Sequence, residues 1–121
     1  MSFTIEIYEK ENGDIPLEIY LNSIDKKMQA KILKAIDLLE ENGNRLREPA
    51  SKALSDGIFE LRIVQGSNIS RVLYFFFIDK KIVLTHGFTK KTSKTPRKEI
   101  ENALNYRNDW LRRNVDELQR I

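Results

Sequence analysis

Three apolar segments separated by very short turns, between residues 58 and 88, constrain the fold of this chain more than any other feature. They read IFELRIV, ISRVLYFFFI and IVLTHGF, and β-branched and aromatic residues dominate them. The first segment alternates in polarity with a period of two, as a half-buried strand does. The short connections QGSN and DKK favour an antiparallel meander. The middle segment is apolar on both faces, so we predict that it lies at the centre of the sheet.

The residues before this meander predict one strand and two helices. Phe3, Ile5 and Ile7 alternate with polar residues, which indicates a further strand. Residues 16–21 are predicted to form a short helix that begins at a proline. Residues 24–41 are predicted to form the main amphipathic helix, because one stripe with a period of 3.6 residues is apolar. That stripe consists of Met28, Ile32, Ala35, Ile36 and Leu39.

The ends of these elements carry recognisable signals. Ser23 is the expected N-cap of the main helix, and Asn42-Gly43 is its expected end. Residues 44–57 are expected to form a loop. A last helix is expected to follow Thr95 as N-cap and Pro96 as first helical residue. The predicted order is strand, two helices, three strands and helix: a single α+β domain over residues 1–121, with helices packed on a small antiparallel sheet.

Composition excludes several classes of protein. The chain has 121 residues, of which 40% are hydrophobic and 32% charged, as in globular proteins. It contains no cysteine and one histidine, which exclude disulfides and make a zinc site a poor fit, so we expect neither metal nor cofactor. No apolar run is long enough to span a membrane. The opening MSFTIEIYEK lacks the features of a secretory signal, and we expect a cytoplasmic location without membrane partners.

Positive charge is concentrated between the last predicted strand and the last predicted helix. No acidic residue interrupts this cluster, which consists of Lys90, Lys91, Lys94, Arg97 and Lys98. Lysines beside a helix N-terminus add to the positive end of its dipole, which is unfavourable unless an anion binds there. The cluster therefore favours a phosphate-bearing partner. A solvated charged turn is the alternative interpretation.

Two arginines are predicted to face each other across the first hairpin. If the chain turns at residues 66–68, Arg62 and Arg71 become neighbours across the ladder. Two adjacent like charges repel unless a negative group lies between them, and the planar guanidinium group suits phosphate. The alternative is a structural ion pair of one arginine with Glu60 or Asp56.

The sequence contains none of the common catalytic motifs. It has no glycine-rich phosphate loop, no nucleophile elbow and no H-E-x-x-H pattern. A cationic site could still cleave RNA, because the 2′-hydroxyl can attack its own phosphodiester while cations stabilise the added charge. His86 is a candidate for proton transfer, although a lone histidine in a strand is more often a structural residue.

Several ordered motifs together resemble one protein family. IFELRI, SRVLYFFF and IVLTHGFTKKTSKTPRKEIENAL are similar to the phage-derived HigB branch of the RelE/ParE toxin superfamily. The similarity covers residues 58–104. It implies a RelE/ParE-like fold and the toxin of a bacterial toxin–antitoxin pair, neutralised by a helix-turn-helix antitoxin.

The resemblance also implies an activity and a set of site residues. Toxins of this branch are typically ribosome-dependent mRNA endonucleases that need no metal, so the implied partner is mRNA on the ribosome. The residues carried over to the RNA site are Arg62, Arg71, Lys90, Lys91 and Lys94, with His86 as a weaker candidate. Arg71 and one turn lysine would hold the scissile phosphate.

One part of the family pattern is missing, and two other functions stay open. The wider superfamily often places a tyrosine or histidine near the C-terminus for proton transfer, but here only Tyr106 is available and its register does not match. The general base is therefore unassigned. A ParE-like toxin that inhibits gyrase, or a nucleic-acid-binding accessory protein without activity, would carry the same cations.

Overall fold

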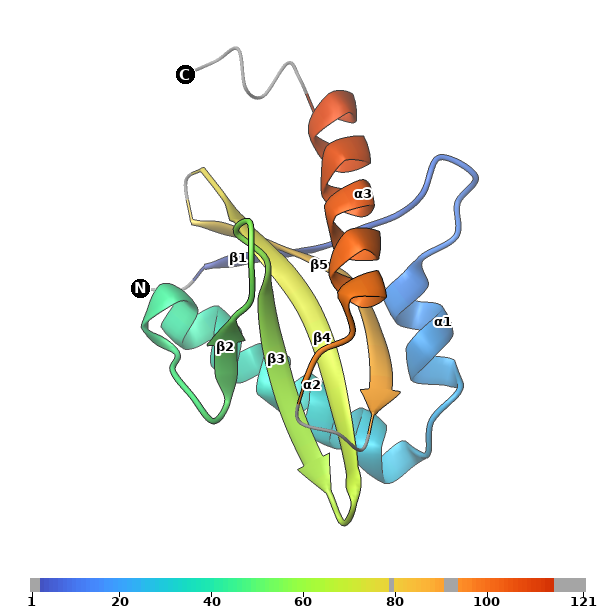
Figure 1. Cartoon of the computed structure of the whole chain (residues 1–121), viewed down its shortest axis with the longest axis vertical. Helices are drawn as coiled ribbons and strands as arrows, with labels where there is room; N and C mark the ends of the chain where they lie inside the picture. Colours follow the sequence, from blue (N-terminus) through green and yellow to red (C-terminus); the bar gives the residue numbers. More distant parts are fainter. Residues whose placement is uncertain (1–2, 79, 91–93, 115–121) are drawn as a thin grey trace.

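The computed structural model describes residues 3–78, 80–90 and 94–114, which form a five-stranded sheet with helices on both faces (Figure 1). The strand order across the sheet is β1-β5-β4-β3-β2. The elements, in chain order, are β1 (Thr4–Ile7), α1 (Pro16–Asn22), α2 (Lys26–Asn42), the 3-10 turn η1 (Gly43–Arg45), β2 (Ser51–Ala53), β3 (Phe59–Gln65), β4 (Asn68–Phe77), β5 (Lys81–Lys90) and α3 (Arg97–Arg113). The predicted α+β class is confirmed.

The meander is confirmed, but two details of the sheet differ from the prediction. β3, β4 and β5 are antiparallel neighbours, and β4 is the central strand. β1, however, pairs with β5 in parallel, so the sheet is mixed. β2 lies in the segment that was predicted to be a loop. Its three residues, Ser-Lys-Ala, have little β propensity of their own, and they are extended because they pair with β3.

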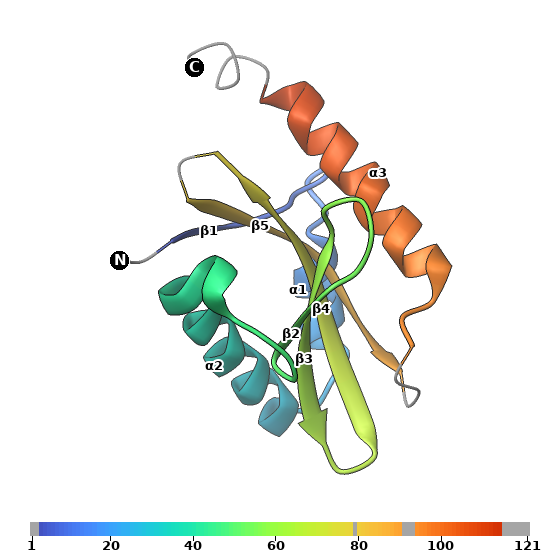
Figure 2. The same ribbon diagram turned by 60° about the vertical axis from the view of Figure 1, so that its left-hand side comes forward.

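Each face of the sheet is covered by a different helical layer. α1 and α2 pack on one face, where the predicted stripe of α2 joins an apolar core with β3, β4 and β5. α3 lies on the opposite face, as the rotated view makes clear (Figure 2). There it buries Ala103 and Trp110 against Leu73, Phe75 and Val83. Within the described residues, no helix combines the length and the apolar character that crossing a membrane requires.

The two predicted helix caps are each displaced. Asp25, not Ser23, caps α2, and its Oδ1 accepts a hydrogen bond from the Met28 N–H at 2.7 Å. Ser23 instead ends α1 and donates its hydroxyl to the Tyr20 carbonyl at 2.6 Å. At α3, Pro96 occupies the cap position. The Thr95 hydroxyl is not available as a cap because it bonds to Glu60.

Candidate functional site

Arg62 and Arg71 lie opposite each other on the face of the sheet that α3 covers. The β3–β4 register makes them direct partners, as predicted. On the other side of β4, Arg71 is the partner of Phe88 in β5, whose side chain packs with the α3 core. Paired residues of neighbouring strands project to the same face, so both arginines point toward α3 and the linker that precedes it.

One carboxylate lies between the two guanidinium groups. Glu60 precedes Arg62 by two residues and therefore projects from the same face. Its Oε1 is 3.2 Å from Arg62 Nε, and its Oε2 is 3.8 Å from Arg71 Nη1. Glu60 and Arg71 have no exposed side-chain surface, whereas Arg62 retains 18%. The structural ion pair that the sequence left as an alternative is thus present, and Glu60 joins both arginines.

Thr95 links this cluster to the start of α3. Its hydroxyl donates to Glu60 Oε2, and Arg71 Nη1 donates to Thr95 Oγ1 at 3.4 Å. Thr95 is itself buried. Thr95 therefore packs against Arg71, whose side chain has no exposed surface through which to contact a ligand in this conformation.

The buried guanidinium group of Arg71 has both a negative and a positive group as neighbours. Burial lowers the pKa of Arg71 most, the neighbouring Glu60 carboxylate raises it, and Arg62 lowers it further. Arginine nevertheless stays charged in proteins. Among the described residues the ion-pair geometry places two cations around one carboxylate, so the Glu60–Arg62–Arg71–Thr95 cluster, here called the arginine cluster, is positive.

The lysines of the basic segment lie at the surface. Lys90 ends β5 beside Ile69, two residues along β4 from Arg71, and its side chain is exposed. Lys94 is exposed as well and directly precedes Thr95. Lys91 lies outside the described residues. The structure thus brings Arg62 and Arg71 together, whereas Lys90, two residues beyond the β5 partner of Arg71, and Lys94, next to Thr95, are exposed to solvent.

His86 is a buried residue with partners for both ring nitrogens. Its Nε2 is 3.0 Å from Glu99 Oε1 on α3, and its Nδ1 is 3.2 Å from Thr85 Oγ1. Burial lowers the pKa of His86, and the hydrogen bond and charge of Glu99 oppose that effect. The Tyr106 ring meets the imidazole edge to face at 5.5 Å between centroids.

Sequence reasoning did not identify Glu99, Thr95 or Tyr106 as parts of these clusters. Glu99 and Tyr106 come from α3, and their approach to β5 depends on how that helix lies over the sheet. Thr95 carried a signal, a hydroxyl residue before a helix, but the signal for a cap is the same as the signal for a residue that bonds elsewhere. Glu60 was visible in the strand pattern as a neighbour of Arg62 on the same face.

A comparison with models of protein families finds one family whose model matches most of the chain. The family model described as "Phage derived protein Gp49-like (DUF891)" matches residues 19–108. The chain belongs to the Gp49-like family. The match runs from α1 to the middle of α3 and includes the arginine cluster. No curated protein matches the chain significantly.

Membership in this family supports the general resemblance inferred from the motifs. The Gp49-like family is a group of RelE/ParE-like proteins associated with the toxins of toxin–antitoxin systems, which implies an antitoxin as partner. The five-stranded α+β fold is compatible with that group.

Proposed function

We propose that this protein is a HigB-like toxin that cleaves mRNA on the ribosome and is neutralised by a cognate helix-turn-helix antitoxin. The observation that carries the proposal is the pairing of Arg62 with Arg71 across the β3–β4 ladder, beside Glu60 and on the face that also ends in Lys90. Bringing two arginines into one ladder position costs electrostatic energy, and a phosphate bound beside them would offset that cost.

The exposed lysines make the first contact with RNA in this proposal. Lys90 and Lys94 are open to solvent, and phosphate contacts from lysine supply most of the sequence-independent affinity for nucleic acid. Lys91 stays in the proposed site on the strength of the motif alone. Arg62, partly exposed, lies behind them, and a phosphate reaches Arg71 only when the Lys94–Pro96 linker moves away from Glu60.

The proposed reaction needs cations and a proton carrier. The ribose 2′-oxygen attacks the adjacent phosphorus as its proton leaves, and the bond to the 5′-oxygen breaks as that oxygen gains a proton. The products are a 2′,3′-cyclic phosphate and a 5′-hydroxyl end. Arginine and lysine stabilise the additional negative charge of the pentavalent transition state. His86 remains a candidate for the proton transfer, because burial lowers its pKa and so favours the neutral imidazole, which can accept a proton.

The test compares two double variants with the same change in charge. Lys90→Ala/Lys94→Ala removes two exposed lysines from the proposed site, and Lys26→Ala/Lys27→Ala removes two exposed lysines from the start of α2, on the other layer. We expect the first variant to lose growth arrest and cleavage of ribosome-bound mRNA by about 10²-fold or more, as for loss of transition-state charge stabilisation. The control should act like the wild type.

Each of the other outcomes identifies a different function. Growth arrest with intact mRNA and blocked gyrase activity would establish a ParE-like inhibitor in place of a nuclease. Harmless expression in the absence of any antitoxin would contradict both toxin hypotheses and favour an accessory nucleic-acid-binding protein. Equal loss of activity in both double variants would show that total charge, and not the proposed site, determines the effect.

A further inference from the structure

α1 and α3 lie on either side of β5 (Figure 1). A solvent-open cavity of about 370 Å³ is lined by residues of these three elements. Four segments supply its walls: the loop after β1, α1, β5 and α3. None of its lining residues belongs to the arginine cluster. Its lining includes Lys10, Tyr20, His86, Gly87 and Tyr106.

The cavity is walled by aromatic rings that other contacts hold in place. The Tyr20 hydroxyl is hydrogen-bonded to Ser70 Oγ at 2.6 Å and to Thr89 Oγ1 at 2.5 Å. Its ring lies directly against the β5 backbone, because Gly87 has no Cβ: an added one would come within 2.4 Å of Tyr20 Cδ2. Tyr20 is therefore fixed both by its hydroxyl and by its ring.

The opposite wall consists of Tyr106 and His86, which further residues hold in place. The Tyr106 ring stacks on Tyr8 at 4.9 Å between centroids and meets His86 edge to face. His86 is in turn held by Glu99 and Thr85. Such a wall presents a flat aromatic surface that loses little conformational entropy when a planar ligand binds.

A cation lies over each of the two stacked tyrosine rings: Lys10 over Tyr106, and Arg113 over Tyr8. Lys10 Nζ lies 5.6 Å from the centre of the Tyr106 ring, and the Lys10 side chain also lines the cavity. Aromatic faces with an adjacent cation are what proteins use to recognise unstacked nucleotides, where the base stacks and the phosphate meets the charge. The cavity volume is at the lower end of the range for small-molecule sites, which suits one nucleotide.

We propose that this cavity is a subsite for one unpaired nucleotide, with its base against Tyr106 and Tyr20 and its phosphate at Lys10. The inference rests on the proposed function in so far as the nucleotide belongs to the RNA substrate. His86 lies between the two sites, since it lines the cavity and projects from the same face of β5 as Phe88, the register partner of Arg71. An RNA strand that crosses β5 would place one nucleotide in the cavity and a neighbouring phosphate near the arginine cluster.

The first experiment measures binding of AMP, UMP and inorganic phosphate to the wild type by NMR titration. We expect both mononucleotides to shift the signals of Tyr106, His86 and Lys10, and inorganic phosphate to bind more weakly than either. Failure of both mononucleotides to bind at millimolar concentration would overturn the subsite. Equal affinity for inorganic phosphate would overturn the role of the aromatic walls.

Matched lysine variants test the charge. Lys10→Glu places a negative charge beside the Tyr106 ring, and Lys80→Glu makes the same change beside the Phe3 ring, where Lys80 Nζ lies 5.9 Å from the ring centre. We expect Lys10→Glu to weaken AMP binding about tenfold or more, as for loss of a charged hydrogen bond. Lys80→Glu should bind as the wild type does, and equal weakening in both would contradict the proposal.

The ring is tested separately from its hydroxyl. Tyr106→Phe should retain binding, and Tyr106→Leu should weaken it about fivefold or more, because the base loses the aromatic face on which it stacks. Urea unfolding of both variants checks that the fold is intact. If Tyr106→Leu does not fold, Lys10→Glu carries the test alone.

RNA separates failure of the subsite from failure of the proposed function. Ribosome-bound mRNA that is cleaved equally well by the wild type and Lys10→Glu would overturn the subsite and leave the nuclease standing. Mononucleotide binding in the cavity of a protein that leaves mRNA intact would uphold the subsite and overturn RNA cleavage.

Discussion

The two ends of α3 are both tied to the rest of the protein by polar networks, and the two networks differ in their contact with water. At the N-terminal end, Thr95 joins α3 to Glu60 and Arg71, which are fully buried. At the C-terminal end, Asp109, Arg112 and Arg113 meet the segment after β1 at the surface. The polar contacts at the start of the helix are thus buried, whereas the arginines and the aspartate at its end are partly exposed to solvent.

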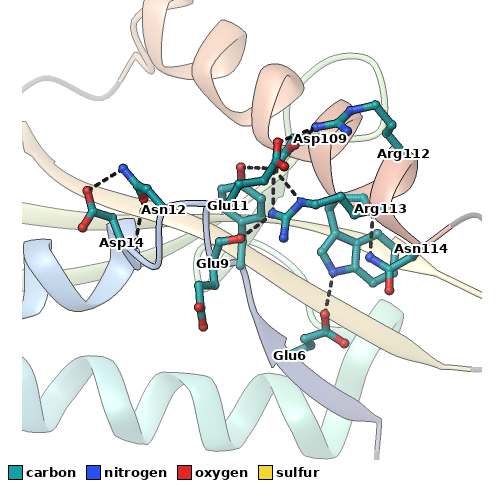
Figure 3. A network of polar contacts seen from close by, with 11 residues as sticks. Glu6, Glu9, Glu11, Asn12, Asp14, Asp109, Arg112, Arg113 and Asn114 are labelled. Atoms are coloured by element: carbon teal, nitrogen blue, oxygen red, sulfur yellow. Dashed lines mark hydrogen bonds and ion pairs between the residues drawn. The ribbon is translucent and has the colours of Figure 1, made fainter.

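The C-terminal contacts, here called the clasp, are drawn in Figure 3. Tyr8 donates its hydroxyl to Asp109 Oδ2 at 2.6 Å, and Arg113 Nη2 donates to the same oxygen, also at 2.6 Å. Arg112 Nη2 reaches Glu11 Oε1 at 2.9 Å, and Trp110 Nε1 donates to Glu6 Oε2 at 2.5 Å. The clasp therefore joins the last turns of α3 to β1 and the loop that follows it.

The two networks also differ in the balance of charge among the residues that form them. In the clasp, two arginines meet two carboxylates, Asp109 and Glu11, and water screens whatever imbalance remains. In the arginine cluster, two arginines share Glu60, and because Glu60 and Arg71 are fully buried, a charge imbalance costs more there than at the surface. The proposed function gives the buried cluster a role, because a phosphate bound there would be held by both guanidinium groups.

The largest expected effect comes from removing the shared carboxylate. Glu60→Ala leaves the buried Arg71 beside Arg62 without its anion, and we expect it to reduce the free energy of unfolding by about 3–5 kcal/mol. Urea denaturation measures this loss. If a phosphate occupies the position between the arginines, added sodium phosphate should restore part of the stability, because a ligand that binds only the folded state stabilises it.

The control for this rescue is sodium chloride at equal ionic strength. Phosphate should raise the midpoint of Glu60→Ala more than that of the wild type, in which Glu60 occupies the position. Equal effects of the two salts on both proteins would remove the arginine cluster as an anion site, even if the variant were strongly destabilised.

The next largest effect is expected from Thr95→Val. The substitution keeps the shape of the side chain but removes the hydroxyl that joins Glu60 to Arg71. A buried polar group deprived of one partner costs about 1–3 kcal/mol, and we expect the unfolding midpoint to fall accordingly. Thr4→Val, at an exposed position of β1, is the matched control and should leave the midpoint unchanged. A Thr95→Val protein as stable as the control would mean that the linker does not secure α3.

The arrangement around α3 also shows which parts of this molecule its sequence could predict. The meander and the amphipathic stripe of α2 were predictable because each is a local periodic pattern. The proximity of Arg62 to Arg71 was predictable because a single short turn sets the register of β3 and β4. The parallel pairing of β1 was not, since polarity patterns carry no strand direction. β2 was missed because its extended form comes from its partner β3.

The sequence predicted which cations form the candidate site, but it did not predict how α3 and Thr95 cover them. The sequence placed positive charge near the start of α3, but a helix pattern does not specify the angle at which the helix crosses a sheet. That angle brings Glu99 to His86 and Tyr106 into the wall of the cavity. The burial of Arg71 under the Thr95 linker is equally a property of tertiary packing.

A smaller effect with a defined pH dependence is expected at the clasp. Hydrogen bonds from Arg113 and Tyr8 lower the pKa of Asp109 from 3.8 to about 2, so its stabilising contribution is complete above pH 4 and is lost as the pH falls toward 2. Burial and the Asp109 carboxylate raise the pKa of Tyr8 from 10.0 to about 12, so that contribution is complete below pH 10 and is lost as the pH rises toward 12.

Tyr8→Phe isolates this contribution. We expect a loss of about 1 kcal/mol near pH 7, because Asp109 keeps its arginine partners. Thermal unfolding from pH 2 to pH 11 should show the gap between wild type and variant closing at both extremes. A gap that stays constant above pH 10 would mean that the Tyr8 hydroxyl does not titrate as its contacts require.

The smallest effect is expected from Arg112→Ala, at the outermost contact of the clasp. Arg112 is well exposed, and its loss leaves Asp109 bonded to Tyr8 and Arg113. Water already screens the charge of Arg112, so the unfolding midpoint should stay within experimental error of the wild type at physiological salt. Measured beside Glu60→Ala, this variant sets the lower end of the scale. A large destabilisation by Arg112→Ala would show that the clasp, and not the buried cluster, is the contact that holds α3.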